Sequence, residues 1–478
     1  MVATPNGRGV VLAKVVIDAT GNSDVAAAAG AKCLYTDETE FGMQGTGLPG
    51  RKLGGTYNNT DFTIVDETDM ADVWRMFVFA KAKYPDAFDQ GRLIDTRERR
   101  RIVGGHTVDI LDQVNGRTFP DSVVRTHSNF DSHGYTIDPY CNIEHPGYGG
   151  FYTYIPYRCM LPECLDGILV VGLGISAHRD AVPMIRMQPD IQNGGYAAGV
   201  AAAMAIDGKI QPRAINVRQL QKHLVEIGNL PESVLTDEDS YPMSDEQIAA
   251  AVQAIGKGEK GVAVALAFPE RALPLLKEAL DKSEGESRLI YARLLATMGD
   301  STGLDVLLDE LKKHKEWDKG WNYRGMNQYG NAMSPQDVLI VSIGYTGSDR
   351  ALPTIFEKMK TLTAEHDFSH HRAVAMALHQ IGSPSAAKPL AELLSKPGMT
   401  GHVQDSIDVA AKLGTPGGTK ACGPRRDSIA ELLLARALYR CGDYGGLGKK
   451  TLTAYTKDLR GHLARHAKAV LESTAEEP

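Results

Sequence analysis

A short apolar strand that runs into a pair of glycines places the strongest constraint on the fold of this chain. Residues 168–177 read ILVVGLGISA, in which Gly172, Gly174 and Ala177 form a G-x-G-x-x-A pattern. This spacing is typical of the first strand, turn and helix of a dinucleotide-binding domain. A helix that began there would be cut short by Pro183, and no second strand ending in an acid follows. The pattern therefore does not predict an NAD-dependent dehydrogenase.

A helix rich in small residues follows this segment. Residues 190–208 read DIQNGGYAAGVAAAMAIDG, and we expect the helix to begin at Asn193, Gly194 and Gly195. Alanine is the strongest helix former, which supports a long helix here. Glycine lets a backbone approach a ligand closely, so the start of this helix is a candidate binding surface.

A second strand followed by a helix lies near the start of the chain. Residues 14–19 are mainly apolar, which suits a buried strand, and the run Ala19, Thr20 and Gly21 ends it. The alanine-rich residues 25–29 then predict a helix whose positive end favours a negatively charged group. Two interpretations stay open from these residues alone: a turn beside a bound cofactor, or a plain strand-to-helix turn of an α/β domain.

Three segments of the chain together resemble a known family. Residues 15–31 (VVIDATGNSDVAAAAGA), 97–123 (opening RERRRIVGG) and 154–205 (opening YIPYRC) occur in this order. Their sequences and their order resemble the FAD-dependent oxidoreductases, and more narrowly a bacterial group of that family. The resemblance covers roughly residues 7–215, and three motifs in order are far more specific than one glycine pattern.

The resemblance implies where FAD would bind. The strand at 168–171 would end at the ribityl chain and pyrophosphate of the cofactor. The helix that begins near Asn193 would direct its positive end at the isoalloxazine ring, where it can stabilise the anionic reduced flavin. The implied cofactor-binding residues are Ala19, Thr20, Gly21, Gly172, Leu173, Gly174, Asn193, Gly194 and Gly195.

Two departures from the family pattern affect this interpretation. Leu173 stands where the family usually has Arg or Asp, so one polar contact to the cofactor is lost. The glycine-rich turn that cradles the ADP phosphates in the family has no counterpart upstream of the strand at 14–19. We therefore expect a fragment or truncated chain with a partial FAD-binding domain, which by itself binds FAD weakly or not at all.

Candidate catalytic residues follow from flavin chemistry, which needs a base near the substrate and a donor near the ring. His178 lies nearest the glycine pattern, and His106 lies in the matched middle segment. Arg186 occupies a family position that suits contact with phosphate or substrate. His133 and His145 are further candidates, and for each of these histidines a structural or surface role is the stronger interpretation.

The segment RERRRIVGGH, residues 97–106, concentrates positive charge in the middle of the resemblance. One or two of its arginines can face the flavin and clamp an anionic substrate, because guanidinium groups bind carboxylates in a fork. The alternative is a solvated strand edge.

From about residue 245 the sequence changes character, and every recognisable element is helical. Four stretches share one form: an apolar helix, a glycine with a small polar residue, and a second helix. The form resembles HEAT-like repeats, whose helix pairs must stack because none buries its apolar face alone. Such a solenoid is either a surface for a protein partner or a structural appendage. The stretches are 291–311, 338–359, 373–394 and 432–452, with glycines at 299, 347, 382 and 442.

The expected fold class is an incomplete α/β FAD/NAD(P)-binding-type domain with an inserted α+β substrate cap, followed by an all-α HEAT-like solenoid. An acidic, polar stretch at 236–247 marks a linker between the two parts. The expected domains are a partial FAD-binding domain (1–34 and 151–232), a cap (35–150), a linker (233–247) and a helical repeat domain (248–478).

Bulk composition narrows the possible partners. The 52 basic and 59 acidic residues give a net charge of −7, which disfavours nucleic acid and anionic membranes. The apolar run at 199–206 is far too short to span a bilayer. The six cysteines form no C-x-x-C pair, so we expect no metal or iron–sulfur site. No signal peptide is recognisable, and the expected location is the cytoplasm.

The sequence thus predicts an FAD-dependent oxidoreductase that transfers a hydride from a small organic substrate to the flavin. The alternative is a non-catalytic interaction protein, with a degenerate flavin domain and a helical solenoid that binds a protein partner. The missing glycine-rich turn and Leu173 favour this alternative.

Overall fold

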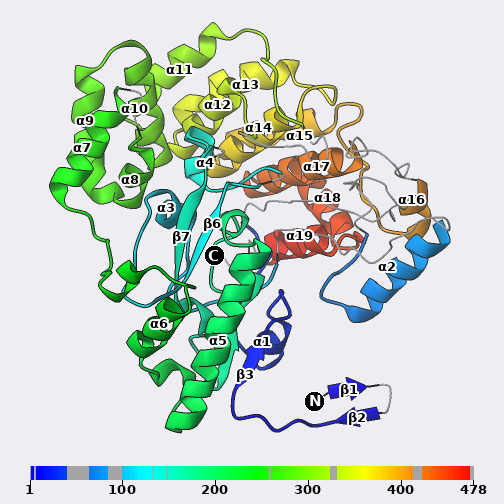
Figure 1. Cartoon of the computed structure of the whole chain (residues 1–478). Helices are drawn as coiled ribbons and strands as arrows, with labels where there is room; N and C mark the ends of the chain where they lie inside the picture. The colour runs from blue at the N-terminus through cyan, green and yellow to red at the C-terminus, as the bar shows by residue number, and fades with distance from the viewer. Residues whose placement is uncertain are drawn as a thin grey trace, which may run out of the picture. The chain divides into compact units, whose positions relative to one another are not determined.

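The computed structural model of the chain divides into two compact units (Figure 1). Each unit is assembled from segments that lie far apart in the sequence. Unit 1 comprises residues 1–35, 99–131 and 147–242, and unit 2 comprises residues 36–98, 132–146 and 243–478. The structure describes residues 2–4, 7–39, 64–83, 99–132, 134–147, 149–257, 260–322, 331–412 and 423–473.

A parallel pair of strands organises unit 1. Strands β3 (Val16–Asp18) and β8 (Ile168–Val170) lie side by side and run in the same direction. Strand β8 is buried along its length, whereas Val16 and Ile17 of β3 remain 38% and 37% exposed. Parallel strands are usually covered on both faces, so the apolar surface of β3 is unusually open.

The other strands of unit 1 form antiparallel pairs: β1 with β2, β4 with β5, and β6 with β7. Helices α5 and α6 both contact β6, and α3 contacts β7. These elements are β1 (Val2–Thr4), β2 (Gly7–Gly9), α1 (Asp24–Ala28), β4 (Cys33–Leu34), β5 (Arg101–Ile102), α3 (Ile110–Val114), β6 (Ser122–Ser128), β7 (Phe151–Pro156), α5 (Gln188–Gly208) and α6 (Val217–Glu226).

The long helix α5 packs into unit 1 through alanines. Ala197, Ala198, Ala201, Ala202 and Ala205 are all buried, at spacings that place them on one side of a helix. They belong to a core that also includes buried residues of β6, β7 and β8. Small side chains allow a helix to lie close to its neighbours, and these alanines form the buried side of α5.

The predicted cap, residues 35–150, is not a compact unit of its own in the structure. Its segment 99–131 carries β5 and β6, which pair with β4 and β7, and therefore belongs to unit 1. Two other segments, 36–98 and 132–146, belong to unit 2. Strand pairing over long sequence separations sets this division, and such pairing leaves little trace in the local sequence pattern.

Unit 2 is built mainly from helices, as the sequence predicts for its C-terminal part. Within the described residues, none of the helices combines the length and the apolar character that a membrane crossing requires. The helices are α2 (Met70–Lys83), α4 (Pro139–Ile143), α7 (Asp245–Ile255), α8 (Val262–Ala267), α9 (Pro269–Lys282), α10 (Gly285–Thr297), α11 (Leu304–Lys313), α12 (Pro335–Tyr345), α13 (Leu352–Thr361), α14 (Phe368–Ile381), α15 (Ala387–Leu394), α16 (Ile407–Lys412), α17 (Gly423–Arg440), α18 (Leu447–Tyr455) and α19 (Gly461–Ser473).

Glycines end the first helix of each predicted helix pair. Gly299 follows α10, Gly347 follows α12, Gly382 follows α14 and Gly442 follows α17, and all four have a positive φ. A left-handed residue just after a helix is most often glycine, because it has no Cβ to clash with the backbone. The second helices α11, α13, α15 and α18 follow. The four predicted helix–glycine–helix stretches are therefore confirmed.

The helix pairs contact one another in chain order. Helix α10 packs on α12, α12 on α14, and α14 on α17, while α11 contacts α13 and α13 contacts α15 (Figure 1). Such contacts between successive pairs are typical of a solenoid. The assignment of these pairs to HEAT-like repeats stays a prediction.

Glycine makes possible a close approach of two helices in this stack. A Cβ built on Gly344 of α12 would lie 2.3 Å from the Cα atom of Ala377 in α14. No real pair of such atoms is found at this distance, so a side chain at Gly344 would force the two helices apart.

We predict that Gly344→Ala destabilises unit 2 by about 1–3 kcal/mol, the range typical of an overpacked core. Chemical unfolding followed by circular dichroism measures the change in the free energy of unfolding. The matched control is Gly347→Ala, which has a positive φ but no atom within 4 Å of its Cβ. The Gly347→Ala substitution should lower the free energy of unfolding by only about 1 kcal/mol, through backbone strain. A Gly344→Ala protein as stable as the parent would contradict the close approach of the two helices.

Candidate functional site

The two parallel strands of unit 1 end at the same edge of their sheet. The amide of Val171 donates to the carbonyl oxygen of Asp18 (3.0 Å), which extends the pairing to the carboxyl ends of both strands. Each strand is followed by a glycine with a left-handed backbone, Gly21 (φ +74°) and Gly172 (φ +71°). Other residues rarely adopt this conformation. The carboxyl edge of a parallel sheet is where α/β proteins usually bind ligands.

A buried carboxylate holds the turn that follows β3. Asp18 is 1% exposed, and its Oδ1 accepts hydrogen bonds from the amide (3.0 Å) and hydroxyl (2.7 Å) of Thr20. Its Oδ2 accepts from the amide of Ala26 in α1 (2.8 Å). Asp18 was not among the site residues predicted from the sequence. The sequence did indicate a structural role for this residue. Asp18 lies at the end of an apolar strand, and a carboxylate that is buried there must find hydrogen-bond donors.

The turn after β3 contacts the turn after β8 directly. The hydroxyl of Ser23 donates to the carbonyl oxygen of Gly174 (2.8 Å), and Ser23 is fully buried. A Cβ built on Gly174 would lie only 2.3 Å from that hydroxyl oxygen. The space beside Gly174 is therefore filled by protein, and packing between the two turns is what requires glycine here. Ser23 was not among the site residues predicted from the sequence, so this contact was missed.

Helix α5 begins earlier than the sequence predicted. It starts at Gln188, with Pro189 in its first turn, and not at Asn193. Proline suits the first turn because its fixed φ is helical and an amide at that position has no helical partner. The predicted start was therefore wrong, and Asn193, Gly194 and Gly195 lie in the second turn.

The true start of α5 lies beside the turn after β8. A Cβ built on Gly172 would lie 3.7 Å from Cγ2 of Ile191, which is in the first turn of the helix. The first amides of a helix lack acceptors within the helix, and its N-terminus carries partial positive charge. The turn and the helix start together form a surface that favours an anionic group.

Two of the predicted glycines face open space. Gly195 has no atom within 4 Å of a built Cβ, and Gly21 has only Nη1 of Arg99, at 3.9 Å. Gly194, by contrast, is buried and makes ordinary contacts with Val124. No protein atom crowds the Cβ position of Gly21 or Gly195, so the backbone is open to close approach at these two residues.

The remaining predicted cofactor residues differ in exposure. Ala19 and Thr20, at the end of β3, are exposed to solvent. Leu173 and Asn193 are partly buried. The structure thus gathers residues 19–21 and 172–174 at one edge, and it brings the start of α5 to the same place.

His106 is held in a polar network. Its Nε2 lies 2.7 Å from Oδ2 of Asp112, and its ring lies 4.9 Å from the ring of Phe119, centroid to centroid. The other oxygen of Asp112 accepts from Arg117 (3.0 Å), which also forms a two-bond pair with Asp239. These contacts fix the position of the His106 ring within unit 1, and its catalytic role stays a prediction.

His178 is neutral over most of the pH range. Burial lowers the pKa of its imidazole to about 4, from an ordinary value of 6.5. Its Nδ1 accepts a hydrogen bond from the amide of Asp180 (3.3 Å). A neutral imidazole that accepts at Nδ1 carries its proton on Nε2. Such a group is a hydrogen-bond donor and a weak base.

The other predicted polar residues lie in different places. Arg186 pairs with Asp131, with Nη2 and Oδ2 2.7 Å apart. Since a paired guanidinium is less available to a ligand, this contact favours a structural role for Arg186. His145 belongs to unit 2, where burial lowers its pKa. His133 lies outside the described residues.

The arginine-rich segment lies against the turn after β3. The backbone amide of Arg100 donates to the side-chain oxygen of Asn22 (2.8 Å), and its guanidinium lies 3.4 Å from Asp24. With Arg99 beside Gly21, this segment brings positive charge to the carboxyl end of β3. Across the described residues, no group of three or more His, Cys, Asp or Glu side chains is arranged to hold a metal ion.

A family model described as FAD dependent oxidoreductase matches residues 69–224 of the chain. The match supports an FAD-dependent oxidoreductase domain, and it includes β8, the turn at Gly172 and the whole of α5. Strand β3, which precedes the matched residues in the sequence, pairs with β8. No curated protein and no solved structure matches the chain.

We predict that the imidazole of His178 titrates with a midpoint near pH 4, which NMR of its ring protons would measure. The unfolded chain takes up a proton as pH falls through about 6.5, whereas the folded chain does so only near pH 4. His178 therefore lowers the free energy of unfolding as pH falls across this window.

The control for this prediction is His178→Gln, which removes the titrating group. As pH falls from 6.5 to 4, the free energy of unfolding of this variant should decrease less than that of the parent. A parent midpoint near 6.5, or equal pH slopes for the two proteins, would show that burial does not keep His178 neutral.

Proposed function

We propose that unit 1 binds FAD at the carboxyl ends of β3 and β8 and oxidises a small organic substrate by hydride transfer. The observation that carries the proposal is the direct contact between the turns after the two strands, beside the start of α5. The family match over β8 and α5 supports the choice of FAD rather than another nucleotide.

Backbone groups hold the cofactor in this proposal. Gly195 offers surface that no side chain approaches, and at Gly21 the Arg99 guanidinium is the neighbour, 3.9 Å from the Cβ position. The first turn of α5 supplies partial positive charge for an anionic part of the cofactor. Asp18 and Ser23 keep the two turns in place without reaching the cofactor themselves. When bound, FAD supplies the hydride acceptor.

His178 supplies a hydrogen-bond donor to the substrate in this proposal. Its Nε2 proton is fixed by the acceptor role of Nδ1, so it can hold a carbonyl or hydroxyl oxygen in one orientation. Arg99, beside Gly21, favours a substrate that carries negative charge. An anionic organic molecule is therefore the substrate class that these residues suit.

The alternative predicted from the sequence, a non-catalytic interaction protein, is not favoured by the family match. We propose that the stacked helix pairs of unit 2 are HEAT-like repeats that offer a surface to a protein partner. The positive-φ glycines at the pair turns and the contacts between successive pairs support this assignment.

We predict that Gly195→Leu weakens FAD binding by about tenfold or more, because the new side chain would occupy the proposed position of the cofactor. The fold should tolerate the change, since nothing lies within 4 Å of the Cβ position. Quenching of flavin fluorescence on titration of the full chain with FAD measures the affinity.

The matched control is Gly199→Leu, one turn further along α5, where a Cβ also meets no atom within 4 Å. This variant should bind FAD as the parent does. Equal affinity of the Gly195→Leu variant and the parent would refute the proposed position of the cofactor. Absence of FAD binding by the parent would refute the proposed function for this chain, and it would agree with the weak binding or none expected from the missing glycine-rich turn.

We predict that His178→Ala slows reduction of the bound flavin by substrate about 100-fold, the typical loss when one positioned donor is removed. His178→Gln keeps an amide donor and should recover part of the rate. Stopped-flow measurement of the loss of flavin absorbance, with a panel of small hydroxy and amino acids, gives the rates. Unchanged rates in the His178→Ala protein would exclude His178 from the reaction.

A further inference from the structure

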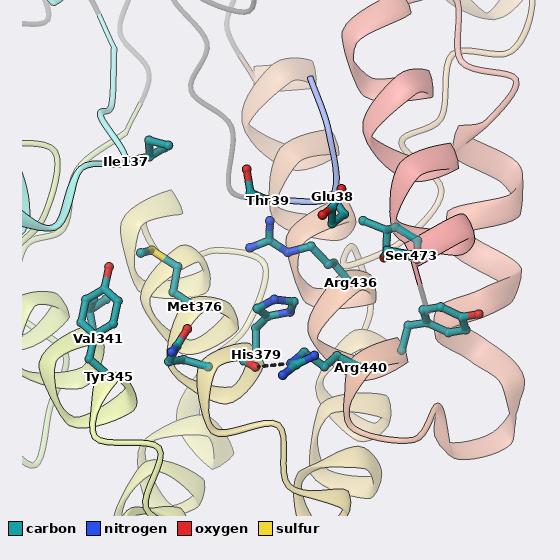
Figure 2. A pocket seen from close by; sticks show the side chains of 13 residues that line it. Glu38, Thr39, Ile137, Val341, Tyr345, Met376, His379, Arg436, Arg440 and Ser473 are labelled. Carbon is teal, nitrogen blue, oxygen red and sulfur yellow. Dashed lines mark hydrogen bonds between the residues drawn. The ribbon is translucent and has the colours of Figure 1, made fainter. Parts of the chain in front are cut away.

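Unit 2 has both a cavity and an exposed helix face. The cavity, of about 400 Å³, is lined mainly by side chains of α12, α14, α17 and α19 (Figure 2). Its lining mixes arginines with tyrosines, a glutamine and aliphatic side chains, and the Nε of Arg440 already donates to the carbonyl oxygen of His379 (3.1 Å). This mixture does not select one class of ligand. The exposed face of α2, by contrast, has a uniform chemistry.

Among the described side chains of α2, those exposed to solvent are all apolar. Met70, Trp74 and Val78 are 81%, 71% and 53% exposed, and Ala71 and Ala82 are exposed as well. Residues four apart lie on the same side of a helix. Met70, Trp74, Val78 and Ala82 therefore form a continuous apolar stripe along α2, which we call the α2 stripe.

The opposite side of α2 is already packed within unit 2. Met76 is fully buried, in a cluster that includes residues 64–65 and side chains of α16. The Nη2 of Arg75 donates to the carbonyl oxygen of Ile64 (2.8 Å), and its Nε pairs with Asp72. These contacts fix the rotation of the helix about its own axis, so the α2 stripe stays directed to solvent. A contiguous exposed apolar patch usually marks an interaction surface.

The two ends of α2 carry opposite charge. At the start of the helix, the exposed Asp69 accepts a hydrogen bond from the amide of Ala71 (2.9 Å). At the other end, the sequence has lysines at positions 81 and 83. A second α2 helix that ran parallel would bring like charges together, whereas an antiparallel one would bring acidic and basic ends together. The charge distribution therefore favours an antiparallel copy of the same helix.

The size of the side chains also changes along the α2 stripe. The large Met70 and Trp74 lie in its first half, and the smaller Val78 and Ala82 lie in its second half. In an antiparallel pair with two-fold symmetry about residue 76, Trp74 of each copy faces Val78 of the other, and Met70 faces Ala82. Large side chains that face small ones interdigitate well. A parallel pair would instead place Trp74 against Trp74.

We propose that α2 is a dimerisation helix, which packs antiparallel against α2 of a second copy of this chain through the α2 stripe. A surface that is complementary to itself in this way forms a closed two-fold dimer. One helix from each copy buries less than the roughly 1,200–2,000 Å² of a standard stable interface, so we expect a reversible dimer with a Kd on the order of 10 μM. The inference rests on unit 2 alone, and it holds whether or not unit 1 binds FAD.

The test is sedimentation velocity of the full chain at concentrations from about 1 to 200 μM, across which the parent should change from monomer to dimer. Trp74→Glu should weaken the association at least about tenfold, because its carboxylate would be buried in the interface without a partner. Since Trp74 is 71% exposed, the fold should not change, which circular dichroism checks. The matched control is Tyr444→Glu, at another exposed aromatic residue of unit 2 outside α2, and it should dimerise as the parent does.

A mixture of two variants tests the antiparallel arrangement. Val78→Lys alone should also weaken self-association, because it places a charge in the α2 stripe. When the Trp74→Glu and Val78→Lys proteins are mixed, the new carboxylate of one copy faces the new ammonium of the other only in an antiparallel pair. The mixture should therefore associate about tenfold more tightly than either variant alone.

The proposal is overturned if the parent stays monomeric over this range, if the Trp74→Glu and Tyr444→Glu proteins dimerise alike, or if the mixture associates no more tightly than the separate variants. The other occupant that suits an apolar helix face is a lipid surface. Binding of a monomeric parent to phosphatidylcholine vesicles, lost in the Trp74→Glu protein, would assign the α2 stripe to lipid and would also overturn the proposal.

Discussion

The hydrogen bond from Ser23 to Gly174 is the interaction on which the candidate site of unit 1 depends. It joins two turns that lie 151 residues apart in the sequence and holds the carboxyl ends of β3 and β8 at one edge. A larger residue than glycine would push the hydroxyl away, since a Cβ would come within 2.3 Å of it. A site made mainly of backbone needs such a fixed scaffold, because it has few side chains that can adjust to a ligand.

Features that depend on neighbouring residues were predictable from the sequence. The glycines that end α10, α12, α14 and α17 were recognised because a helix end and a left-handed residue occur together within a few positions. The start of α5 was also predicted from neighbouring residues, and that prediction was wrong. Asn193 and the two glycines after it are typical of a helix start, but Pro189 provides an earlier one and nothing between them stops a helix.

Features that depend on distant residues were not predictable in the same way. The role of Gly174 is set by Ser23, and the place of residues 99–131 in unit 1 is set by pairing of β5 and β6 with β4 and β7. Neither partner can be identified from spacing or composition. The resemblance to a family brought residues 15–31, 97–123 and 154–205 together in one domain. The packing between them shows that Gly174 faces protein, whereas no protein atom lies within 4 Å of the Cβ position of Gly195.

The small size of the parallel sheet links cofactor binding to the stability of unit 1. Two strands of three residues expose part of their apolar surface at Val16 and Ile17, so the pair relies on its contacts with the buried side of α5 and with the neighbouring turns. A ligand that contacts both turns and the start of α5 binds only when these three elements are assembled. Binding of such a ligand therefore raises the free energy of unfolding of unit 1. The increase grows with the logarithm of the ratio between the ligand concentration and its dissociation constant. In unit 1, the flavin would therefore act as part of the fold as well as part of the chemistry.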